Sequence, residues 1–155
     1  SFPTRRSSDL PDFIRVHATG IKLESKLGEF VRDGSFTLQS EEEIVIEQKL
    51  FLQQLHEMDS YYVNEHIVNL LLEVRGNLRT EKQEMLSTID RFLTLPPDER
   101  LLFTVGRRLN IFFRLDDLKK PKLHQKAGES LQQILSKNPH VDFAALCNYV
   151  RQSQI

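Results

Sequence analysis

Three arginines on one predicted helix have the residue type and spacing needed to bind a phosphate-bearing partner. Arg100, Arg107 and Arg114 are seven residues apart, and at about 100° per residue this spacing predicts one solvent-facing stripe. Guanidinium groups donate paired hydrogen bonds to phosphate oxygens, so the stripe is a candidate contact for an anionic partner. The opposite side of the helix carries the apolar residues Leu101, Val105, Leu109 and Phe112.

A lysine-rich turn follows the arginine stripe and extends the same candidate contact. The sequence KKPK contributes Lys119, Lys120 and Lys122, and a clustered set of cations favours RNA binding through this basic region. The alternative is a solubilising surface whose cations balance neighbouring carboxylates. Both interpretations stay open.

Charge is distributed unevenly along the chain. Residues 39–73 carry eight acidic side chains against one basic, a net charge of −7. Residues 97–126 carry eight basic side chains against four acidic, a net charge of +4. The whole chain has a formal net charge of −1 and a pI of about 6.5, so its bulk charge does not demand a nucleic-acid partner.

The sequence contains no catalytic, cofactor-binding or metal-binding motif. The five histidines lack the spacing of a zinc site, and the six glycines are isolated, without a phosphate-binding loop. The single cysteine, Cys147, excludes an intrachain disulfide. It lies on an apolar helix face, which predicts core packing in an intracellular, reducing compartment. We therefore expect no enzyme activity, no cofactor and no small-molecule ligand.

The elements that must position the cations are predicted to be helices. Apolar periodicity predicts helices over residues 21–34, 40–55, 63–76, 80–93, 97–113, 121–135 and 138–150. Ser40 and Glu43 have capping-box spacing, as do Thr80 and Gln83, and Pro97 suits a first helical turn. Strand alternation is confined to the short stretch SFTLQ, so the predicted class is all-α.

The last four predicted helices repeat with a spacing of 42 residues, which aligns Leu93 with Leu135 and Val105 with Cys147. An earlier copy fits at a spacing of 38 residues. Such periods are typical of helical hairpins stacked as an α-solenoid, because one helix pair cannot bury its own apolar stripe. The predicted units are about 41–76, 80–113 and 121–151, and an irregular helical bundle is the alternative.

The rhythm of these units resembles the degenerate helical repeats of the FAST kinase domain family. It is carried by NEHIVNLLLEVRGNL, LPPDERLLFTVGRRLNIFF and LHQKAGESLQQILSKNPHVDFAALCNYV, and it covers about residues 50–151. The resemblance implies a mitochondrial, RNA-processing protein, and it implies no kinase chemistry, since kinase motifs do not occur in this sequence. Armadillo and HEAT arrays have a similar rhythm.

Residues 1–10, SFPTRRSSDL, resemble the translation of a widely used short-read sequencing adapter. The last adapter codon begins with CT and encodes Leu with any third base. We therefore expect residues 1–10 to be a disordered artefact and residues 11–155 to be a partial helical-repeat domain. On this expectation the native targeting signal is missing, which leaves cytoplasm and mitochondrial matrix undecided.

Together these features predict a non-catalytic helical-repeat scaffold that binds other macromolecules. A protein is the expected partner, and RNA is the alternative partner through the basic region. The apolar runs are only a few residues long, too short for a membrane span.

Overall fold

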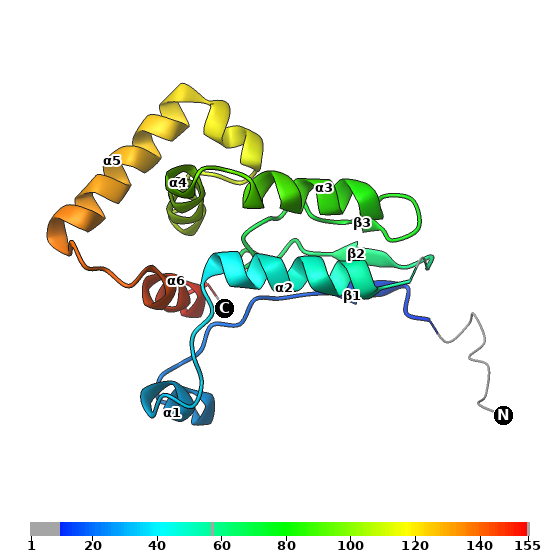
Figure 1. Ribbon diagram of the computed structural model, residues 1–155, viewed down its shortest axis with the longest axis horizontal. Coiled ribbons are helices and arrows are strands. Elements are labelled where there is room, and N and C mark those ends of the chain that lie inside the picture. Colours follow the sequence, from blue (N-terminus) through cyan, green and yellow to red (C-terminus); the bar gives the residue numbers. More distant parts are fainter. Residues whose placement is uncertain (1–9, 57, 155) are drawn as a thin grey trace.

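The computed structural model describes residues 10–56 and 58–154 (Figure 1). Helices are its main elements: α1 (Lys26–Arg32), α2 (Glu41–Gln54), α3 (Lys82–Leu93), α4 (Pro97–Arg108), the short 3-10 helix η2 (Leu115–Lys119), α5 (Pro121–Lys137) and α6 (Phe143–Gln152). The segment that resembles an adapter lies outside the described residues, except for Leu10. No described helix is both long and apolar enough to cross a bilayer.

The fold also contains a small sheet. The all-α prediction is therefore correct in that helices predominate, but it did not include the sheet. The strands are β1 (Phe13–Arg15), β2 (Tyr61–Val63) and β3 (Gly76–Asn77), in the order β1-β2-β3. β1 runs parallel to β2, with Phe13 opposite Tyr61, and β3 runs antiparallel to β2. None of these strands lies in SFTLQ, the stretch with strand alternation.

Several helix starts were predicted correctly from capping residues and prolines in the sequence. Ser40 and Glu43 form the predicted capping box of α2, and Pro97 and Pro121 begin α4 and α5. Two predicted starts are wrong. Thr80 does not cap α3, and α6 begins at Phe143, where the preceding residue, an aspartate, accepts hydrogen bonds from two backbone amides.

The largest difference from the prediction lies at residues 61–77, where a helix over residues 63–76 was expected as the second helix of the first repeat unit. They form β2, turns and β3 instead. Four of the five predicted apolar positions are nevertheless buried, namely Val63, Leu70, Leu71 and Val74, whereas the fifth, Ile67, is exposed. Tertiary hydrogen bonds replace helical ones here, because the carbonyl oxygens of Ile67, Asn69 and Leu70 accept from the Arg107 guanidinium.

α4 is the central helix of the molecule, and its second half is buried on every side, while its first residues, Pro97 and Asp98, are exposed. It packs against both α5 and α6, and every residue from 102 to 108 is buried. In Figure 1 it lies end-on between α3 and α5. Its Phe103 ring stacks on Phe112, with centroids 5.9 Å apart and planes at 8°, and a Cβ on Gly106 would lie 2.3 Å from that Phe112 ring.

The helix packing does not establish the predicted solenoid. α2 packs against α3, and α4 packs against two different helices. The first predicted unit, 41–76, is one helix followed by strands, so it is not a helical hairpin. α4 also ends earlier than expected, since Asn110 has a φ of +56°. As a result Leu109 and Phe113, which were predicted to be core residues, are exposed.

Candidate functional site

The predicted arginine stripe does not exist as a surface, because Arg107 is fully buried. Its exposed fraction is 0%, and its guanidinium donates to carbonyl oxygens of the segment between β2 and β3, including that of Leu70 at 2.9 Å. Burial, with Arg108 beside it, lowers the pKa of Arg107 to about 10, so the group stays cationic at neutral pH. Residues 102–108 of α4 are buried on all sides, so this part of the helix has no solvent-facing side on which such a stripe could continue.

Arg100 is also engaged within the fold. Its Nη1 donates to the carbonyl oxygens of Leu93 and Leu95 at 2.6 and 2.9 Å, and its Nε lies 3.2 Å from a carboxylate oxygen of Glu42. These contacts fasten the end of α3 and the start of α2 to α4. Arg100 is therefore a structural residue in this fold rather than a free surface cation.

The other four predicted contact residues are exposed and lie together on η2 and the start of α5. Arg114 precedes η2, and Lys119, Lys120 and Lys122 follow along nine residues of chain. Two of these charges are already paired, since Lys119 binds Asp116 and Lys120 binds an aspartate on the same short helix, each at 2.7 Å. Four of the six predicted basic residues are therefore exposed, and two of these four are paired with aspartates.

A second ionic cluster is buried and joins α2, α4 and α6. The carboxylate of Glu41 accepts from Arg108 Nε and Nη2 at 3.1 and 2.5 Å and also pairs with Arg151. Cys147 lies close to this cluster, and its burial, with the Glu41 charge, raises the pKa of the thiol to about 12. Core packing of Cys147 is confirmed, because its exposed fraction is 2%.

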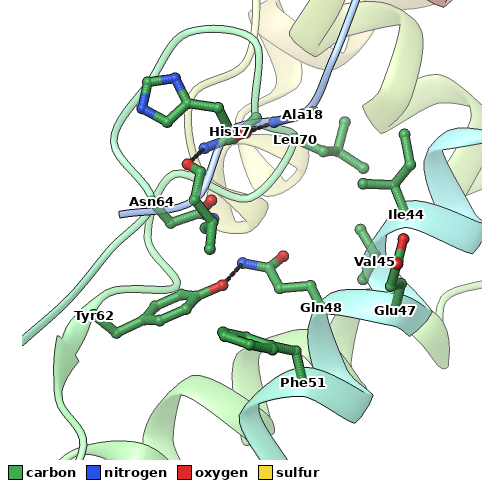
Figure 2. Close-up of a pocket in the computed structure, with 12 residues that line it drawn as sticks. His17, Ala18, Ile44, Val45, Glu47, Gln48, Phe51, Tyr62, Asn64 and Leu70 are labelled. Carbon is green, nitrogen blue, oxygen red and sulfur yellow. Dashed lines mark hydrogen bonds between the residues drawn. The ribbon is translucent and has the colours of Figure 1, made fainter. Parts of the chain in front are cut away.

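The best candidate site is a pocket of about 290 Å³ between α2 and the strand segments. α2 contributes one wall through Ile44, Gln48 and Phe51, while β2 and the residue after it contribute Tyr62 and Asn64. The capping box explains why α2 begins at Glu41, and the turn angle of the helix then directs every third or fourth side chain to this side. Figure 2 shows these side chains converging from the two sides of the pocket.

Two hydrogen bonds hold the polar part of the pocket in place. Gln48 Nε2 donates to the Tyr62 hydroxyl at 3.0 Å (Figure 2), and Asn64 Nδ2 donates to the Leu71 carbonyl oxygen at 2.6 Å. Burial raises the pKa of Tyr62 to about 12, against a smaller opposing effect of the Gln48 hydrogen bond. The Tyr62 hydroxyl therefore stays protonated and is not an acid or base at neutral pH.

Asn69 closes the end of the pocket by tying in the chain that follows β1. Its Oδ1 accepts from the Ala18 amide at 2.7 Å, and its Nδ2 donates to the Val16 carbonyl oxygen at 2.8 Å. His17 lies on the rim, with its ring 4.4 Å from that of His66. The backbone on this side is thus fixed by side-chain contacts across about fifty residues of chain.

The rim of the pocket carries one carboxylate. Glu47 is exposed and accepts a hydrogen bond from Gln39 at 3.2 Å, and no lysine or arginine is among the described residues that line the pocket. The remaining walls are mainly apolar. Such a site binds an apolar group by burial and orients it through a few polar contacts.

Neither metal chemistry nor similarity to known proteins adds to this site. Within residues 10–56 and 58–154, no group of three or more His, Cys, Asp or Glu side chains is arranged to hold a metal ion. No protein-family model, curated protein or solved structure matches the chain.

The pocket residues were not predicted from the sequence. Gln48, Tyr62 and Asn64 belong to no motif, and they meet only because β2 replaces the predicted helix. The aromatic and β-branched run Tyr61-Tyr62-Val63 is the local signal that favours a strand at this position.

Proposed function

We propose that this chain is a non-catalytic protein-binding module whose partner inserts a side chain into the pocket beside α2. The pocket itself carries the proposal. Its volume of about 290 Å³ is at the lower end of the range of about 300–1,000 Å³ for ligand pockets. This size suits one large side chain rather than an organic cofactor, and the exposed ring of Phe51 gives a partner direct access.

Selection from a random peptide library displayed on phage tests the proposal. We expect enriched peptides to bind Phe51→Ala at least about tenfold more weakly than the wild type, since an anchor contact is worth more than about 1.4 kcal/mol. Leu50→Ala is the matched control, because Leu50 is also exposed on α2 but does not line the pocket. Equal loss in both variants, or no loss in either, would exclude the pocket as the binding site.

A narrower proposal is that the chain contains helical repeats. It is supported by the burial of residues that align with one another at the 42-residue spacing. Met85 and Ala127 are both buried, as are Val105 and Cys147. This agreement supports α3–α4 and α5–α6 as two related hairpins of a scaffold. A relation to the FAST kinase domain family rests on the same register and stays a proposal.

RNA binding is the second candidate function, favoured by the exposed cations Arg114, Lys119, Lys120 and Lys122. Filter binding of a single-stranded homopolymer across a salt series tests it. The RNA proposal predicts that log affinity falls with log salt by about 0.7 per phosphate contact, and that replacing all four residues by Ala flattens this slope. Absence of binding at low salt would contradict it.

A further inference from the structure

The pocket beside α2 presents two side-chain amide oxygens as hydrogen-bond acceptors, next to the Tyr62 hydroxyl. Gln48 uses its Nε2 on Tyr62, and Asn64 uses its Nδ2 on a backbone carbonyl oxygen. The amide oxygens of both residues receive no hydrogen bond from any described residue. An occupant with N–H donors would satisfy these oxygens, and leaving them unpaired next to an apolar occupant carries a free-energy cost.

The charge of the pocket points in the same direction as its acceptors. Glu47 on the rim supplies one negative charge, and the described lining contains neither lysine nor arginine to balance it. Arginines from other segments pair with Glu41, Glu42 and Glu65, so Glu47 is the carboxylate that acts on the pocket. An anionic occupant is therefore repelled, and a cationic one is attracted.

The apolar walls define the rest of the occupant. The rings of Phe51 and Tyr62 have centroids 6.5 Å apart, with planes at 42°, and Ile44, Val45 and Leu70 complete the walls. A flexible methylene stem is buried favourably against such walls. A cation close to the face of an aromatic ring gains further electrostatic attraction.

We propose that the pocket receives the side chain of a lysine or arginine from the partner protein. The methylene stem lies along Phe51 and the aliphatic walls, and the charged end donates to the free amide oxygens and to Glu47. This inference rests on the proposed protein-binding function and specifies which residue of the partner is recognised.

Titration of the isotope-labelled protein with n-butylammonium and with the neutral analogue of the same chain length, 1-butanol, tests the inference by NMR. We expect n-butylammonium to shift the side-chain amide signals of Gln48 and Asn64 and the ring signals of Tyr62, and to bind more tightly than 1-butanol. Glu47→Gln should weaken n-butylammonium binding by about two- to fivefold, the effect of losing one exposed charge pair. Glu24→Gln, on an exposed loop outside the pocket, should leave it unchanged.

Equal or tighter binding of 1-butanol, or equal affinity in Glu47→Gln and wild type, would overturn the inference. Failure of the protein-binding function has a different signature. Selected peptides that depend on Phe51 but contain no lysine or arginine would leave protein binding intact and reject a cationic anchor. Glu47-dependent binding of n-butylammonium without any Phe51-dependent peptide would support the cation site and reject the peptide partner.

Discussion

Arg107 Nε donates to the carbonyl oxygen of Leu70 at 2.9 Å and so joins the central helix to a segment 37 residues earlier. The same guanidinium also binds the carbonyl oxygens of Ile67, Asn69 and Phe112. One side chain thus satisfies backbone acceptors that the predicted helix over residues 63–76 would otherwise have paired. The residue expected to bind a partner instead organises the fold beside the candidate pocket.

Replacement of Arg107 by Met should therefore destabilise the protein strongly. The change leaves several buried carbonyl oxygens without donors, each at a cost of about 1–3 kcal/mol, so we expect the free energy of unfolding to fall by about 3 kcal/mol or more. Urea unfolding followed by circular dichroism measures this. Arg114→Met is the control, because exposed Arg114 should change stability by no more than about 0.5 kcal/mol. Similar effects of the two substitutions would contradict the buried role of Arg107.

Two glycine-to-alanine substitutions should have opposite effects on stability. A Cβ at Gly106 would lie 2.3 Å from the Phe112 ring, whereas one at Gly128 meets nothing within 4 Å. We expect Gly106→Ala to cost about 1–3 kcal/mol through overpacking, and Gly128→Ala to gain up to about 1 kcal/mol through helix propensity in α5. Thermal unfolding of the two variants checks the signs, and a stabilising Gly106→Ala would show that α4 does not pack against Phe112.

Asp117 should contribute to stability in a pH-dependent manner. Burial acts to raise its pKa, but hydrogen bonds from Lys120 and from the Phe113 and Arg114 amides outweigh burial and lower the pKa below 3.8. A lowered folded-state pKa stabilises the protein above the unfolded pKa, and this contribution is lost as the pH falls through the folded pKa. The stability difference between wild type and Asp117→Asn should therefore shrink below about pH 4. A constant difference between pH 7 and pH 3 would contradict this.

Cys147 should be unreactive in the folded protein. Burial raises its pKa to about 12, and thiolate, not thiol, is the reactive form. We expect Ellman's reagent to modify Cys147 at neutral pH only on denaturation, with full modification in 6 M guanidinium chloride as the control. Rapid modification of the native protein would show that the junction of α2, α4 and α6 opens readily.

The features that could be predicted from the sequence are those determined by interactions between residues close together in the chain. The Ser40–Glu43 capping box and the helix start at Pro97 involve only residues within one turn, and both were predicted correctly. Leu70 and Val74 were predicted to be buried, and they are. Their secondary structure was predicted wrongly. The spacing of apolar residues carries no information about Arg107, which lies on a distant helix and binds the carbonyl oxygens of this segment.

The candidate pocket also depends on contacts between residues that lie far apart in the sequence. β1 reaches β2 across nearly fifty residues, and Gln48 meets Tyr62 only when β2 lies beside α2. No spacing along the chain encodes this meeting. The exposed cations around η2 were predicted from their clustering in the sequence, and pairing with neighbouring carboxylates was the alternative, which Lys119 and Lys120 adopt with Asp116 and Asp117.

The most direct test of the central claim is the pattern of intermolecular nuclear Overhauser effects between a selected peptide and the labelled protein. The proposal predicts contacts from the methylene protons of a peptide lysine or arginine to the ring protons of Phe51 and Tyr62. Contacts confined to surfaces that exclude both rings, such as α1 or η2, would contradict it.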